Sequence, residues 1–320
     1  MFESRLQTEA KKSRAALIGN SPILVFFLVF IVSGFLSAIP RYIYLYAKTM
    51  PNISKYMGEL VNSEELYNEL FTDVNNIVQS SGYYIVVLFS QIFVAVSCAV
   101  FCRVIEKRSL YSMGLGGKTS PLHYIFGAVV GLSMISLVFF LCKATGAMDY
   151  AGKGSRDLSL IFLLMLGFMV EGIAEEILFR GYFMISYSVR HSMAYSVVVS
   201  SLLFTLFNAG NGYITFFSCV NTFLFSVFVS LYFLKTENIW GASAIHFAWN
   251  FAQGNIFGLA GNGAVFSSFY TFKQNNAHIT VNGGTAGPEG GLAVTFVLVL
   301  SIMILLLLSE RKDKKNNGGN

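Results

Sequence analysis

Long apolar segments alternate with short polar connections along the whole chain. Eight segments are apolar enough to span a membrane, at residues 22–39, 83–102, 122–142, 158–185, 193–208, 214–234, 239–257 and 291–308. A helix needs about 20 predominantly apolar residues to cross the hydrocarbon core of a bilayer. The pattern therefore predicts an all-α fold, a polytopic membrane helical bundle of about eight transmembrane helices.

The amino-acid composition agrees with this interpretation and excludes a packed soluble protein. Hydrophobic residues make up 54% of the 320 residues and charged residues only 12%, whereas about a quarter of a soluble domain is charged. The net charge of +5 is explained by basic residues at the cytoplasmic face and by anionic lipid headgroups. The lipid bilayer is therefore an expected partner, and nucleic acid is not.

Basic residues in the connections predict the orientation of the bundle. If the amino terminus is cytoplasmic, fourteen lysines and arginines fall in inside segments and seven in outside segments. Because short cytoplasmic connections carry an excess of these residues, both termini are expected in the cytoplasm. The inside connection at residues 103–121 contains a basic patch, which we expect to lie at the lipid headgroups.

The chain is expected to form a single integral membrane domain over residues 1–320. Its parts are a core motif region, two outside loops and a cytoplasmic tail, at residues 158–257, 48–81, 258–290 and 309–320. The first loop is expected to contain one or two amphipathic helices on the membrane surface. The second loop is rich in glycine and asparagine and is expected to be irregular. The tail is short, basic and polar, which favours disorder.

An unusual group of charges lies in the apolar segment 158–185. It contains Glu171, Glu175, Glu176 and Arg180, although an ionisable side chain near the bilayer centre costs roughly 2.5–3.5 kcal/mol. Helical periodicity places Glu176 and Arg180 on one face, so they can pair and leave Glu175 free to face another group. Gly172 lies near Glu175 on the helix and allows a backbone or a substrate to approach closely. The alternative is a structural ion-pair network that only fixes helix packing.

Two further segments supply polar side chains. His246 and Asn250 are four residues apart and therefore project from one face of a helix. Asn208 ends the fifth apolar segment, where an asparagine also serves to cap a helix. A helix that starts at Met193 places Asn208 about 22 Å along its axis, whereas Glu175 and His246 are expected nearer the cytoplasmic side. The spacing therefore leaves open whether Asn208 reaches the other polar residues.

These residues together suggest hydrolysis. The candidate site comprises six residues on three spans: Glu175, Glu176, Arg180, Asn208, His246 and Asn250. A carboxylate in a partly dry site is a usable general base for water, and a histidine and an asparagine can donate hydrogen bonds to the oxyanion that forms when that water attacks a carbonyl. This chemistry cleaves a peptide bond without a covalent nucleophile.

A zinc site is the competing interpretation, because carboxylates and histidine also bind zinc. The chain has no His-Glu-x-x-His helix, and His246 is the only histidine well inside a span, so three protein ligands would require both Glu175 and Glu176. The four cysteines lie in apolar segments without metal-ligand spacing. We therefore expect no metal and no cofactor.

The motifs resemble those of a known family. Glu175-Glu176-x-x-x-Arg180, Phe204-x-x-x-Asn208 and His246-x-x-x-Asn250 follow one another in separate spans, and they resemble the three motifs of the CPBP family, the CAAX prenyl endopeptidases and bacteriocin-processing enzymes, also called the Abi family. The resemblance covers about residues 158–257. It implies an eight-helix intramembrane glutamic protease with a cavity open to the cytosol.

The resemblance also implies a role for each residue. Glu175 would activate the water, Glu176 and Arg180 would support the site, and His246 and Asn250 would form the oxyanion pocket. The family's second motif normally ends in histidine, and here that position is Asn208. Asparagine can hold a water but cannot accept its proton at neutral pH, so the general-base role would fall to Glu175 alone.

The prediction is therefore a multi-pass intramembrane endopeptidase in a bacterial plasma membrane, acting on peptide or membrane-protein substrates. One alternative is a catalytically impaired family member that serves as an immunity or scaffold protein. A second is a proton-coupled transporter, for which no inverted repeat of broken helices is evident in the sequence.

Overall fold

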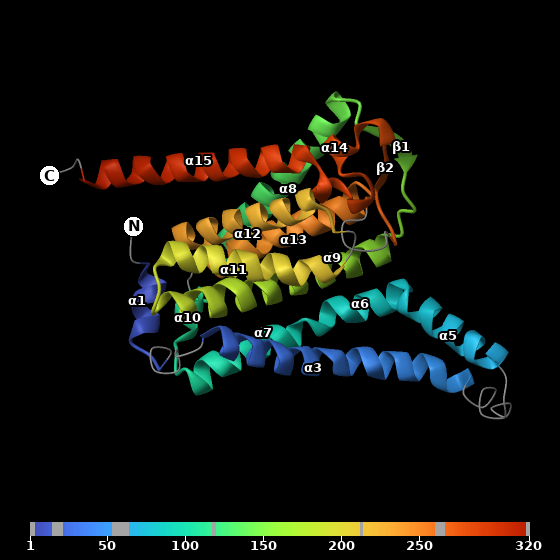
Figure 1. Ribbon diagram of the computed structural model, residues 1–320, viewed down its shortest axis with the longest axis horizontal. Helices are drawn as coiled ribbons and strands as arrows, with labels where there is room; N and C mark the ends of the chain where they lie inside the picture. The colour runs from blue at the N-terminus through green and yellow to red at the C-terminus, as the bar shows by residue number, and fades with distance from the viewer. Residues whose placement is uncertain are drawn as a thin grey trace.

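The computed structural model describes residues 4–14, 22–52, 64–116, 120–211, 214–259 and 266–317. Over these residues the chain is a bundle of long helices with a small two-stranded sheet at one end (Figure 1). The helices are α1 (Arg5–Lys11), α3 (Pro22–Thr49), α5 (Glu64–Val78), α6 (Ser81–Ser90), α7 (Ile92–Val100), α8 (Ser120–Ala144), α9 (Leu158–Glu176), α10 (Ile185–Ser188), α11 (Met193–Asn208), α12 (Phe216–Thr236), α13 (Ile239–Phe251), α14 (Ile279–Asn282) and α15 (Leu292–Asn317).

Three of these helices continue into π-helical segments. They are Phe101–Ile105 after α7, Ile177–Met184 between α9 and α10, and Ala252–Ile256 after α13. Within the described residues, six continuous helical segments are long and apolar enough to cross a membrane: Pro22–Thr49, Ser81–Ile105, Ser120–Ala144, Leu158–Ser188, Phe216–Thr236 and Leu292–Ser309. The chain is therefore a multi-pass membrane protein, and the prediction of an all-α polytopic bundle is confirmed.

The remaining two predicted spans are also helical. α11 is apolar but shorter than the six long segments. α13 lies against α8, α9 and α12 and has most of its side chains buried. α13 therefore belongs to the interior of the bundle, where it can carry polar groups that lipid would not tolerate. α11 keeps one exposed apolar face, with Tyr195, Val198, Leu202 and Leu206.

Glycines allow the central helices to approach each other closely. A Cβ atom at Gly127 or Gly131 of α8 would collide with the carbonyl oxygens of Gly241 or Ile245 on α13. A Cβ atom at Gly172 of α9 would lie 2.9 Å from the carbonyl oxygen of Ser243, so the close backbone approach predicted there is confirmed. Small residues of this kind are typical of helix contacts in membranes, because packing rather than the hydrophobic effect drives association there.

The second outside loop is ordered over its described residues, which corrects the expectation of an irregular segment. Within residues 266–290, β2 (Tyr270–Gln274) pairs antiparallel with β1 (Met148–Lys153), and α14 follows. The Nδ2 atom of Asn282 donates to the carbonyl oxygens of Ala147 and Asn275. The asparagines that suggested irregularity therefore satisfy backbone groups and fix the loop to the bundle. We call residues 266–291 the cap.

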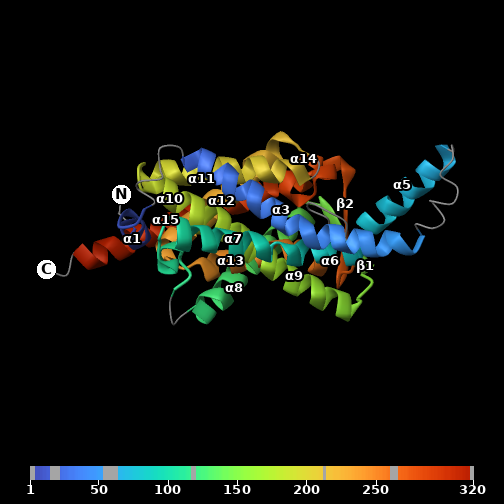
Figure 2. The ribbon, with the colours of Figure 1, turned by 90° about the horizontal axis from the view of Figure 1, so that it is seen from below.

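The predicted tail is also structured. α15 continues past the apolar segment to Asn317, whereas disorder was expected from residue 309. A started helix gains one hydrogen bond for each added residue, and residues 309–317 contain neither glycine nor proline. α1 and the far end of α15 lie at the same end of the bundle, opposite the β1–β2 sheet (Figures 1 and 2).

The first outside loop contains α5, in agreement with the predicted amphipathic helix, and residues 53–63 lie outside the described part. α5 extends beyond the bundle together with the end of α3 (Figures 1 and 2).

The basic connection after α7 is only partly exposed, with Arg103 and Lys107 at the surface. Glu106 and Arg108 are buried and form an ion pair, with 3.2 Å between Arg108 Nη1 and Glu106 Oε2. The guanidinium of Arg108 also donates to the carbonyl oxygens of Gly181 and Tyr182. Because a π-helical turn leaves carbonyl groups without regular partners, Arg108 stabilises the Ile177–Met184 segment.

We expect Gly131→Ala to lower the free energy of unfolding by about 1–3 kcal/mol, since α8 and α13 must move apart to accommodate the methyl group. Gly34→Ala on α3 is the matched control, because a Cβ atom there meets nothing within 4 Å. Thermal unfolding of both variants in detergent measures the difference. Equal stability of the two variants would refute the close contact between α8 and α13.

Candidate active site

The site begins with a fully buried ion pair on one helix. Nη1 of Arg180 lies 2.9 Å from Oε1 of Glu176, and both side chains have no exposed surface. The four-residue spacing predicted this pair. A buried charge is tolerated only when it is paired and hydrogen-bonded, and the guanidinium also donates to Oγ of Ser226 and Ser230 on α12. The ring of Phe204 lies 4.5 Å from the guanidinium carbon.

His246 joins this ion pair from α13. Its Nδ1 atom lies 2.9 Å from the same Oε1 atom of Glu176, and its ring packs edge-on against Phe204 and Phe225. An ionised carboxylate can only accept hydrogen bonds, so Nδ1 carries a hydrogen when Glu176 is ionised. The contact fixes the ring and directs Nε2 away from Glu176.

Glu175 lies on the other side of the imidazole. Its Oε2 atom is 3.9 Å from Nε2 of His246, and 23% of its side chain is exposed. Glu176 is completely buried, and its Oε2 atom has no hydrogen-bond partner within the described residues. The two adjacent glutamates are therefore distinct: Glu176 is enclosed with Arg180, and Glu175 is partly exposed.

Asn250 connects the site to a third glutamate. Its Nδ2 atom donates to Oε2 of Glu171 over 3.2 Å. Glu171 was recognised in the sequence as part of the charged group but was not assigned to the site. Its spacing of four residues from Glu175 is the signal that indicates a shared helix face.

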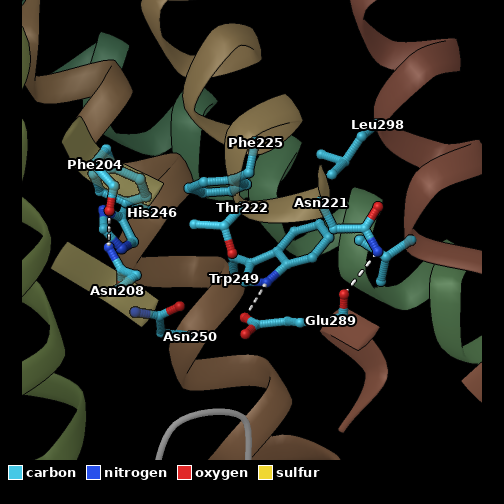
Figure 3. Close-up of a pocket in the computed structure, with 11 residues that line it drawn as sticks. Phe204, Asn208, Asn221, Thr222, Phe225, His246, Trp249, Asn250, Glu289 and Leu298 are labelled. Atoms are coloured by element: carbon cyan, nitrogen blue, oxygen red, sulfur yellow. Dashed lines mark hydrogen bonds between the residues drawn. The ribbon is translucent and has the colours of Figure 1, made fainter. Parts of the chain in front are cut away.

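A pocket joins the histidine motif to the end of α11. The space inside it, including the part that is open to solvent, is about 420 Å³, and Figure 3 shows the side chains that line it. The lining residues are Phe204, Asn208, Asn221, Thr222, Phe225, His246, Trp249, Asn250, Glu289, Val294 and Leu298. Asn208 therefore does reach the surroundings of His246 and Asn250, which answers the question that the spacing left open. Its Nδ2 atom donates to the carbonyl oxygen of Phe204, one turn earlier.

Most pocket residues were not among the predicted site residues, and Glu289 and Asn221 are two of them. Glu289 precedes α15, and its Oε1 atom accepts a hydrogen bond of 3.3 Å from Nε1 of Trp249. Asn221 on α12 donates to the backbone carbonyl oxygens of Glu289 and Gly291. The sequence offered one signal for Glu289, which is the only acidic residue between residues 258 and 291. Nothing in the sequence indicates that the cap folds back onto α12 and α13.

The pocket lies in the half of the bundle that is farther from the termini. Its walls include Asn208 at the end of α11, Asn221 near the start of α12 and Glu289 before α15. If the termini are cytoplasmic, as the basic residues predict, this pocket lies in the outer half of the membrane. A cavity open to the cytosol, which the family resemblance implies, requires the opposite orientation.

The residues of the site do not form a metal centre. Within the described part of the chain, no group of three or more histidine, cysteine, aspartate or glutamate side chains is arranged to hold a metal ion. Glu176 is already engaged by Arg180 and His246, so it is not available as a zinc ligand.

Comparison with known proteins assigns the segment that carries this geometry. No curated protein matches the chain. Residues 157–252 match the family model described as type II CAAX prenyl endopeptidase, Rce1-like. This range includes all six predicted site residues and Glu171, and it excludes Glu289. The resemblance to the CPBP family seen in the sequence is thus confirmed over residues 157–252, the segment that is similar to the Rce1-like intramembrane proteases.

Proposed function

We propose that this protein is an intramembrane endopeptidase in which Glu175 activates the attacking water. The observation that carries the proposal is the difference between the two adjacent glutamates. Glu176 is enclosed with Arg180, whereas Glu175 is partly exposed and faces Nε2 of His246. A general base must reach both water and the reacting carbonyl, and of these two carboxylates only Glu175 meets that requirement.

The proposed reaction proceeds by direct attack of water on the peptide carbonyl. Glu175 takes a proton from the water as its oxygen bonds to the carbonyl carbon. The oxyanion accepts hydrogen bonds from Nε2–H of a protonated His246 and from the amide of Asn250. Glu175 then delivers the proton to the leaving nitrogen as the C–N bond breaks. No covalent enzyme intermediate forms.

Glu176 and Arg180 act as positioning residues in this proposal. The Glu176 carboxylate holds Nδ1 of His246, and Arg180 in turn holds Glu176 through contacts with α12. The imidazole is thereby oriented before substrate binds, and such preorganisation is what makes hydrogen bonds effective in a transition state. The substrate is a peptide or a membrane protein, and by resemblance the enzyme acts in the plasma membrane of a bacterium.

A catalytically impaired scaffold protein is the second candidate function, and Asn208 is the observation in its favour. Asn208 lines the pocket beside His246, at the position where the family resemblance implies a histidine. An amide cannot accept a proton at neutral pH, so any assistance that this position gives to Glu175 is limited to hydrogen bonding.

Glu175→Gln is expected to lower peptide hydrolysis by about 10²–10⁴-fold, because the amide cannot take a proton from water. Cleavage of a quenched fluorescent peptide library by purified protein in proteoliposomes measures the change. The charge-matched control is Glu64→Gln on the exposed start of α5. Full activity of Glu175→Gln would rule out this mechanism.

Glu176→Gln distinguishes positioning from chemistry. This change leaves Arg180 without its buried counter-ion, which is expected to destabilise the fold by about 3–5 kcal/mol. Thermal unfolding should therefore separate the two variants, with Glu176→Gln much less stable than wild type and Glu175→Gln close to it. The reverse order would mean that the two roles are exchanged.

Asn208→His is expected to raise the rate of hydrolysis by about tenfold or more, since an imidazole at this position can share the general-base role. The measurement is the initial rate on the same peptide library across pH 5–9. Asn208→Gln is the control that changes size without adding a titratable group. If Asn208 is not what limits hydrolysis, the Asn208→His variant will be as inactive as the Asn208→Gln variant. That result would contradict the prediction.

Chelation tests the zinc alternative. A water activated by Glu175 requires no metal, so prolonged treatment with 1,10-phenanthroline or EDTA should leave the rate within about twofold of the untreated enzyme. A loss that is restored by added zinc would establish a metalloprotease instead.

A further inference from the structure

Glu289 is placed at the pocket by the cap rather than by a membrane helix. It lies in the turn Pro288–Gly290, which Asn221 of α12 fixes through the backbone carbonyl of Glu289 itself. The Glu289 side chain is half-buried, and its Oε1 atom accepts the hydrogen bond from Trp249. Within the described residues its second carboxylate oxygen has no hydrogen-bond partner. Figure 3 shows the Glu289 carboxylate below the ring of Trp249, with Asn250 and Asn208 farther to the left.

The charges around the pocket are unbalanced. Four carboxylates belong to this region, those of Glu171, Glu175, Glu176 and Glu289, and the one guanidinium, that of Arg180, is paired with Glu176. The lining residues of the pocket include neither lysine nor arginine. The protonated His246 is the one cationic side chain in the lining, and it already faces Glu175 and Glu176. A half-buried carboxylate without a directly paired cation is unfavourable, so the pocket electrostatically favours an occupant that brings a further positive charge.

The surroundings of Glu289 also favour a positively charged occupant. Burial raises the pKa of Glu289, and the hydrogen bond from Trp249 and the nearby His246 oppose the rise. An ammonium or guanidinium group in the pocket would favour the ionised carboxylate. The neighbouring side chains suit such a group, since Asn208, Thr222 and Asn250 carry acceptor oxygens and the face of Trp249 can attract a cation.

We propose that Glu289 forms a subsite for a basic group of the substrate and thereby selects the peptides that are cut. The basic group is the ammonium or guanidinium of a lysine or arginine side chain, or the amino terminus of a short peptide. The inference rests on the proposed function, because it names the substrate class of the same pocket. Glu289 acts on specificity, whereas Glu175 acts on the chemical step.

Selectivity among peptides is the first test. A library of peptides that carry lysine, arginine, glutamine or glutamate at each position in turn is offered to the enzyme, in acetylated and free amino-terminal forms. We expect wild type to favour a basic residue over glutamine by about tenfold at one position near the cut. A preference that depends on acetylation instead identifies the amino terminus as the bound group.

Three variants show whether Glu289 causes this preference. Glu289→Gln should abolish the ratio between lysine and glutamine peptides, and Glu289→Lys should reverse it in favour of glutamate peptides. Misfolding cannot produce such a reversal. Asp149→Asn is the charge-matched control on the exposed β1 strand and should keep the wild-type ratio. Unchanged ratios in both Glu289 variants would overturn the subsite.

A binding measurement separates this proposal from the proposed function. The chain has two tryptophans, so Trp240→Phe leaves Trp249, the hydrogen-bond partner of Glu289, as the sole tryptophan, whose emission can be excited selectively over that of the tyrosines. In a Trp240→Phe, Glu175→Gln background no cleavage is expected, and titration with the lysine peptide should change the Trp249 emission with saturation. Adding Glu289→Gln should weaken binding by about tenfold.

The two proposals then fail in different ways. Saturable, Glu289-dependent binding in a protein that cleaves no peptide supports the subsite and refutes the protease. Cleavage that ignores basic residues, with Trp249 emission insensitive to the lysine peptide, refutes the subsite and supports the protease.

Discussion

The buried ion pair between Glu176 and Arg180 is the interaction on which the site depends. In a low-dielectric bundle, either charge alone would be strongly unfavourable. Together they satisfy each other, and the serines of α12 and Nδ1 of His246 fill much of their remaining hydrogen-bonding capacity. The pair thus holds α9, α12 and α13 in one arrangement. It also orients the imidazole without occupying Glu175.

This arrangement requires helices that approach closely. Gly172 of α9 and the two glycines of α8 bring backbone against α13 on two sides. Lateral freedom of α13 would change the separations between Glu175, Glu176 and His246, and hydrogen-bond geometry tolerates only a few tenths of an ångström. Packing of small residues therefore sets the precision of the polar site, although none of those residues takes part in the chemistry.

The sequence was sufficient for features that depend on local periodicity. Apolar length predicted the helices, and four-residue spacing predicted both the pair of Glu176 with Arg180 and the common face of His246 and Asn250. Features that depend on how distant segments meet were not predictable. The depth of Asn208 depends on the tilt of α11. The burial of Arg108 depends on the π-helical carbonyl groups that it contacts. The position of Glu289 at the pocket depends on a cap that folds back onto α12. Asparagines in that cap suggested irregularity because their partners lie more than a hundred residues away, as with Asn282 and Ala147.

In the proposed mechanism, the helices carry out the chemistry and the cap selects the substrate. Every residue proposed to act on the peptide bond lies within residues 157–252, the segment that matches the Rce1-like family. Glu289 lies outside that segment and reaches the pocket through one turn held by Asn221. Substitutions in the cap can therefore alter the charge of one pocket wall while the ion pair and the histidine stay in place. A protease built this way can change its substrates without rebuilding its catalytic residues, because Glu289 of the cap lines the same pocket as His246 and Asn250 but comes from a different segment of the chain.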